Sequence, residues 1–127
     1  MMRGFHYDAH PMGMFISTLS GMSTFHPSAN PALAGQGVYK DTKLRNKQIH
    51  RLLGAAPTIA ANCYRVRIGR PFNMPQKNLG YVENFLYMLD NLNDTNYRAS
   101  PKLVRALEVL FILHAEHELN CSTAAVR

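Results

Sequence analysis

Residues 100–123 read SPKLVRALEVLFILHAEHELNCST, and this stretch decides the fold class. Ser100 can cap a helix that has Pro101 at its first position, where a missing N–H is tolerated. Apolar residues then recur every three or four positions and form one helical stripe that ends in a histidine: Leu103, Ala106, Leu107, Leu110, Phe111 and His114. The flanks of the stripe are apolar as well. Helices with several apolar faces are usually buried in a larger core or at a subunit contact, so the sequence indicates a piece of a larger protein.

The first part of the chain predicts a helix over about residues 11–23, with Asp8 as a plausible cap. Its apolar residues recur at spacings of three and four and are expected to share one stripe: Met12, Phe15, Ile16, Leu19 and Met22. Residues 27–40 contain two prolines and two glycines, so they predict a loop or a short irregular excursion.

A second helix is expected from a cap at Asp41 or Thr42 to about Ala56. Pro57 should kink or divide its continuation through Val66, because proline cannot donate a helical hydrogen bond. A further helix is expected over about residues 81–90, before a cluster of turn formers. No strand-like alternation is present, and the class is therefore all-α, with about six helices in one domain.

The composition limits the class of protein. The chain has 127 residues, 46% of them hydrophobic, and a formal net charge of +6, which fits one globular domain and excludes disordered or collagen-like chains. No apolar run approaches the roughly 18 residues of a membrane helix, and the first residues lack the apolar segment of a secretory signal. Basic charge admits nucleic acid, acidic membrane or anionic small molecules as partners. Most of it alternates with apolar residues at helical spacing, which is typical of a solvated helix face: Lys40, Lys43, Arg45, Lys47 and Arg51.

Two cysteines occur, Cys63 and Cys121, and each lies in a predicted helix outside any pair motif. Free buried thiols in a reducing compartment are therefore favoured over a disulfide. Cys121 could act as a nucleophile beside His117, but a small buried thiol is the simpler interpretation.

A polar cluster follows the apolar helix. His114 and His117 are about 60° apart around a helix and could address one ligand together. On spacing alone, a surface pair of His114 with Glu118, and a core His117, is the simpler interpretation. Asn120 and the hydroxyl residues after it can end one helix and begin another, which would open amide N–H groups beside the imidazoles. Such an arrangement suits a carboxylate, and two or three hydrogen bonds of about 1.5 to 3 kcal/mol each could hold a small dicarboxylate.

Two other classes of function remain open from the residues. A metal-dependent hydrolase would use His114 and His117 as ligands, although this segment matches neither common zinc-protease pattern. A basic helical nucleic-acid-binding module would use Lys43, Arg45, Lys47 and Arg51.

Four separated blocks resemble, in order, the large-domain helices of citrate synthase. They are DAHPM (8–12), APTIAA (56–61), ENFLYML (83–89) and FILHAEHE (111–118). A further pair, HPSANPAL (26–33) and KLRNKQ (43–48), resembles the plant peroxisomal or glyoxysomal branch.

The resemblance implies a helical homodimer with a large and a small domain and an active site in the cleft between them. It implies condensation of acetyl-CoA with oxaloacetate, followed by hydrolysis of citryl-CoA, with no tightly bound cofactor, metal, nucleic acid or membrane. His117 matches the family histidine that hydrogen-bonds oxaloacetate, Asn120 an amide near the same substrate, and His114 a neighbouring histidine.

By the same resemblance, residues 1–127 are part of the large domain, and the catalytic histidines, the aspartate base and the carboxylate-binding arginines lie downstream. No catalytic residue is therefore expected in this chain, which should be inactive alone. A 2-methylcitrate synthase is the related alternative. The resemblance implies a peroxisomal or glyoxysomal location, with the mitochondrial matrix or bacterial cytoplasm as alternatives.

Overall fold

The computed structural model describes residues 1–115, in which all the regular structure is helical. There are five α-helices in this range: α1 (Pro11–Gly21), α2 (Pro31–Ala34), α3 (Thr42–Arg67), α4 (Tyr81–Asp90) and α5 (Pro101–Ala115). Four short 3-10 helices lie at Met2–Gly4, Met22–Phe25, Pro27–Ala29 and Gln36–Tyr39. The all-α prediction is confirmed. Within the same range, no helix combines the length and apolar character required to cross a membrane.

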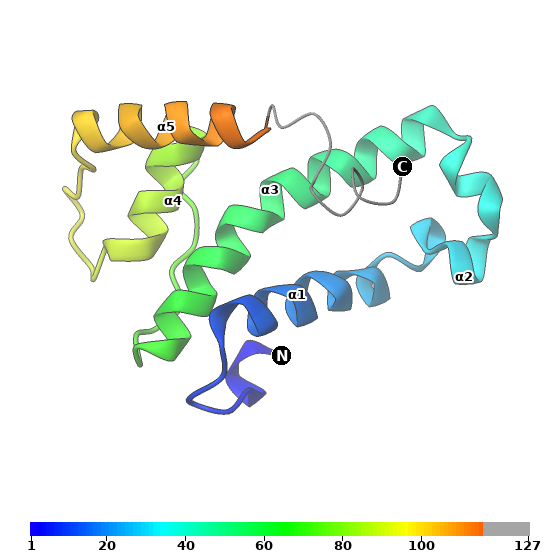
Figure 1. Ribbon diagram of the computed structural model, residues 1–127, viewed down its shortest axis with the longest axis horizontal. Coiled ribbons are helices and arrows are strands. Elements are labelled where there is room, and N and C mark those ends of the chain that lie inside the picture. Colours follow the sequence, from blue (N-terminus) through cyan, green and yellow to red (C-terminus); the bar gives the residue numbers. More distant parts are fainter. Residues whose placement is uncertain (116–127) are drawn as a thin grey trace, which may run out of the picture.

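α3 is the helix around which the others are arranged (Figure 1). Asp41 caps it, with Oδ1 accepting hydrogen bonds from the backbone N–H groups of Lys43 at 2.9 Å and Leu44 at 3.1 Å. Of the two residues predicted as possible caps, Asp41 and Thr42, the cap is therefore Asp41. After α1, the chain passes through short helical elements and then runs back along α1 as α3. Those at residues 27–40 form the irregular excursion that was predicted there.

α3 runs through Pro57 as one helix, so of the two predicted outcomes, a kink or a division, the division is wrong. Proline has no N–H to donate to the carbonyl four residues earlier, which leaves the oxygen of Leu53 without that helical partner. The hydroxyl of Tyr81 donates to this oxygen at 3.0 Å. A side chain from α4 thus supplies the hydrogen bond that the proline cannot make.

The start of α1 also differs from expectation. His10, not Asp8, is the N-cap, and its Nδ1 accepts a hydrogen bond from the N–H of Met12 at 3.1 Å. Asp8 lies too far before Pro11 to cap the helix. Its carboxylate instead forms an ion pair with Arg67 at 3.0 Å, which ties the segment before α1 to the end of α3.

The core between α1 and α3 is centred on Met14, Ile59 and Cys63, which are 2%, 7% and 1% exposed. The predicted stripe of α1 is therefore only partly correct. Phe15, Leu19 and Met22 do pack against this core. Met12 and Ile16, however, remain 57% and 59% exposed, because the line that faces α3 is centred on Met14.

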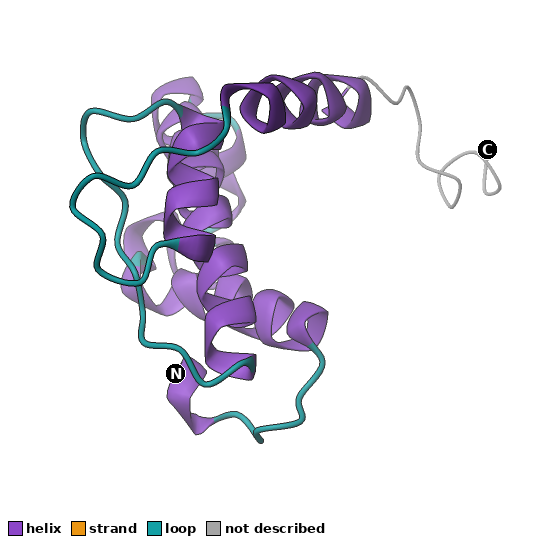
Figure 2. Cartoon of the chain, turned by 90° about the vertical axis from the view of Figure 1, so that its left-hand side faces the viewer, coloured by secondary structure: helices purple, strands orange, loops and turns teal. Residues whose placement is uncertain are grey.

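α3 and α4 are also in contact, and both carry further buried apolar side chains: Ala61, Val82, Leu86 and Met88. α5 then crosses the end of α4 and lies away from α1 (Figures 1 and 2). Pro101 is its first residue, as predicted. None of the residues of α5 is buried, so this helix is attached along one side only.

Candidate oxaloacetate wall at the end of α5

The three predicted substrate-binding residues fall at or beyond the end of α5. His117 and Asn120 lie outside the described residues. His114 lies in the last turn of α5, and its side chain is exposed. The structure therefore places one of the three predicted residues, and places it at the surface.

The ring of His114 bonds to its own helix. Its Nδ1 lies 2.7 Å from the carbonyl oxygen of Leu110, one turn earlier. A carbonyl oxygen only accepts hydrogen bonds, so this nitrogen carries the proton. The contact fixes the direction of the imidazole, which leaves its other nitrogen to face away from the helix backbone.

Aromatic side chains set the position of this end of α5. The ring of Phe111 lies 6.5 Å from the ring of Tyr81, nearly edge-on at 75°, and 6.1 Å from the ring of Phe85. Such pairs prefer tilted or edge-to-face geometry. Tyr81 in turn donates to the Leu53 carbonyl. The turn that carries His114 is thus connected to the middle of α3 through α4.

A buried arginine fixes α4 itself. The guanidinium of Arg65, 2% exposed, donates to carbonyl oxygens alone: Pro71 at 2.6 Å, Met88 at 3.3 Å, Leu89 at 3.1 Å and Asn91 at 3.0 Å. The last three belong to the C-terminal end of α4, where helical carbonyls lack partners and the helix dipole favours a cation. Sequence reasoning missed Arg65, because an arginine late in a helix looks the same whether it is exposed or buried.

Amide side chains complete this support. Asn62 Nδ2 donates to the carbonyl of Asn73 at 3.1 Å, and the Asn73 N–H donates back to Asn62 Oδ1 at 3.0 Å. Asn73 Nδ2 donates to the Tyr87 carbonyl at 3.1 Å. These bonds hold the connector between α3 and α4 in one conformation.

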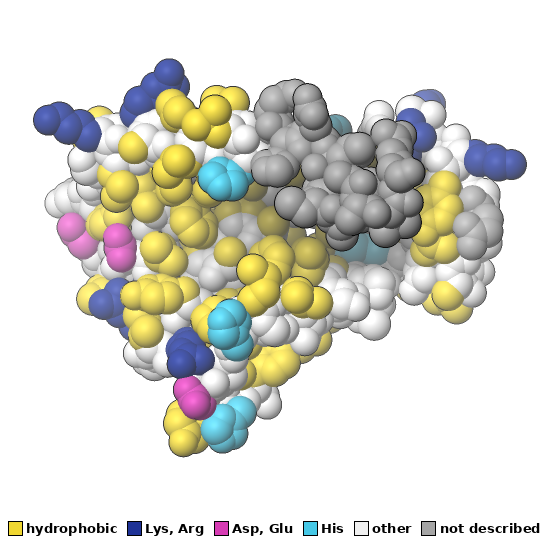
Figure 3. Space-filling view, viewed as in Figure 1, with side chains coloured by type: hydrophobic (Ala, Val, Ile, Leu, Met, Phe, Trp, Pro, Cys, Tyr) yellow, Lys and Arg dark blue, Asp and Glu magenta, His cyan; other side chains and the backbone are white. Residues whose placement is uncertain are grey.

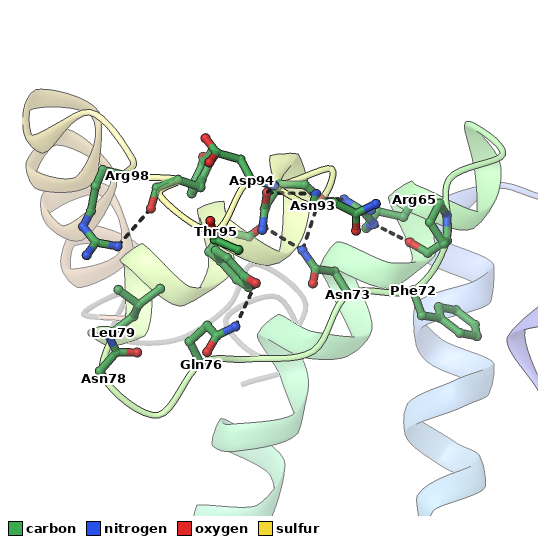
Figure 4. A pocket seen from close by; sticks show the side chains of 14 residues that line it. Arg65, Phe72, Asn73, Gln76, Asn78, Leu79, Asn93, Asp94, Thr95 and Arg98 are labelled. Atoms are coloured by element: carbon green, nitrogen blue, oxygen red, sulfur yellow. Dashed lines mark hydrogen bonds between the residues drawn. The ribbon is translucent and has the colours of Figure 1, made fainter.

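The connector and the loop after α4 line an open, mainly polar pocket of about 440 Å³, shown in Figure 4. Many of the polar groups in its wall are already paired within the protein. Gln76 Nε2 donates to the hydroxyl of Tyr87 at 2.8 Å, and Arg65 serves the carbonyls of α4. Burial, and secondly the carboxylate of Asp90, raises the pKa of Tyr97, so its hydroxyl stays protonated and donates to the Leu86 carbonyl. These polar groups therefore stabilise α4 and its flanking loops, against which α5 packs.

The described residues give little support to the other predicted kinds of site: a cysteine nucleophile, a metal site and a basic nucleic-acid-binding surface. Cys63 is a free, buried thiol, as predicted, and burial raises its pKa, which disfavours the reactive thiolate. Cys121 lies outside the described residues. Within residues 1–115, no three His, Cys, Asp or Glu side chains are grouped so that they could hold a metal ion. The basic side chains at the start of α3 are mostly solvent-exposed, as predicted for a solvated face.

Large hydrophobic side chains cover part of the surface (Figure 3). On α5 the most exposed ones are Leu103 (51%), Leu110 (48%), Ile112 (63%) and Leu113 (61%). On α3 they include Ile49 (45%), Leu52 (45%) and Leu53 (57%), and on α1 they include Met12 and Ile16. Apolar surface of this extent is typical of a part that packs against more protein.

The comparisons with known proteins identify the class. All 127 residues match the family model described as citrate synthase, C-terminal domain. The chain is 65% identical over its full length to a citrate synthase of Dictyostelium discoideum, and 62% identical over its full length to a peroxisomal citrate synthase of the same organism. It is 58% identical over 95% of its length to a glyoxysomal citrate synthase of Cucurbita maxima.

The chain belongs to the citrate synthase family. It spans about a quarter of the length of these relatives: 25%, 26% and 23%. The resemblance seen in the four sequence blocks is thereby confirmed. The peroxisomal and glyoxysomal names agree with the branch that residues 26–33 and 43–48 resemble.

Proposed function

We propose that these 127 residues are part of the large domain of a citrate synthase, an acyltransferase that condenses acetyl-CoA with oxaloacetate to give citrate and CoA. The observation that carries the proposal is the family match across the whole chain, together with 65% identity to a protein named citrate synthase. The helical fold agrees with it.

In this proposal the end of α5 and the residues after it form one wall of the oxaloacetate site. His117 and Asn120 contribute hydrogen bonds to the substrate, and His114 stands beside them. The catalytic groups come from other parts of the full-length protein, and no tightly bound cofactor or metal is required. The support for this wall is the connection of α5 through Phe111 and Tyr81 to α3.

We also propose that the full-length protein is a homodimer and that the exposed apolar faces of α1 and α3 pack against other protein within it. The supporting observation is the exposure of Met12, Ile16, Ile49, Leu52 and Leu53. A peroxisomal or glyoxysomal location is proposed from the names of the relatives. Sedimentation of the full-length protein tests the dimer, and a monomer that retains full activity contradicts it.

Release of CoA from acetyl-CoA and oxaloacetate, measured with a thiol reagent, tests the activity. The full-length protein that contains this chain should turn over, and the purified 127-residue chain should not. Propionyl-CoA in place of acetyl-CoA separates this activity from that of a 2-methylcitrate synthase. A full-length protein that is inactive with acetyl-CoA, or a 127-residue chain that condenses the substrates alone, contradicts the proposal.

A further inference from the structure

We draw no further inference here: the strongest candidate, the open polar pocket between the α3–α4 connector and the loop after α4, has its buried arginine, Arg65, bound to the carbonyl oxygens already described, and nothing in the structure shows what would occupy it.

Discussion

Replacement of Arg65 by methionine should loosen α4 selectively. Methionine fills a similar volume without any donor, so four carbonyl oxygens lose their guanidinium partner. Those of Pro71 and Asn91 belong to residues that line the pocket, where water can replace the lost bond. The oxygens of Met88 and Leu89 are left at the end of α4. At roughly 1 to 3 kcal/mol for each of these two buried groups left unpaired, we expect a loss of about 2 to 6 kcal/mol.

Hydrogen exchange of the amides of α4 in the full-length protein measures this loss. A cost of about 2 to 6 kcal/mol corresponds to roughly 30- to 20,000-fold faster exchange, since about 1.4 kcal/mol is a factor of ten. Arg67→Met is the matched control, because Arg67 lies on the same helix and its ion pair with Asp8 is exposed. Its cost should stay near or below about 1 kcal/mol. Equal exchange of α4 in the two variants would refute the role given to Arg65.

Three further changes test the local structure. Tyr81→Phe removes the donor to the Leu53 carbonyl, so it should destabilise α3 near Pro57 by about 0.5 to 1.5 kcal/mol, measured by hydrogen exchange; unchanged exchange of α3 contradicts this. Asp41→Ala removes both capping bonds and should lower the urea midpoint by the equivalent of about 1 kcal/mol, whereas Asp41→Ser should lower it less. Because burial raises the pKa of Cys63, its thiol should resist alkylation in the native protein at a pH where the unfolded chain reacts. The contribution of the Cys63 thiol to stability is present below the unfolded-state pKa and is lost as the pH rises through the folded-state pKa. Rapid labelling of Cys63 in the native protein contradicts the prediction.

The sequence predicted the features that depend on local pattern. The all-α class, a cap at Asp41 or Thr42 and the start of α5 at Pro101 follow from periodicity and from the chemistry of helix ends. The apolar character of α5 also predicted a helix that requires more protein around it, and that helix has no buried residue here.

Features that depend on distant partners were not predictable. Pro57 predicts a break in α3 when only neighbours are considered, but Tyr81 compensates from 24 positions later. From the sequence alone Arg65 would be taken for a surface cation. Its burial follows from the end of α4, whose carbonyl oxygens it binds. Met12 and Ile16 share the period of the core stripe, and only the position of α3 decides which side of α1 is covered. The sequence predicted three substrate-binding residues. Of these, only His114 lies among the residues that the structure describes.

The most direct test of the central claim is the affinity of the full-length protein for oxaloacetate, measured by isothermal titration calorimetry, with His117→Ala compared against wild type. Loss of one charge-assisted hydrogen bond of about 1.5 to 3 kcal/mol predicts about 10- to 150-fold weaker binding. His50→Ala serves as the control and should bind as wild type does. An unchanged affinity in His117→Ala would contradict the claim that this part of the chain forms a wall of the substrate site.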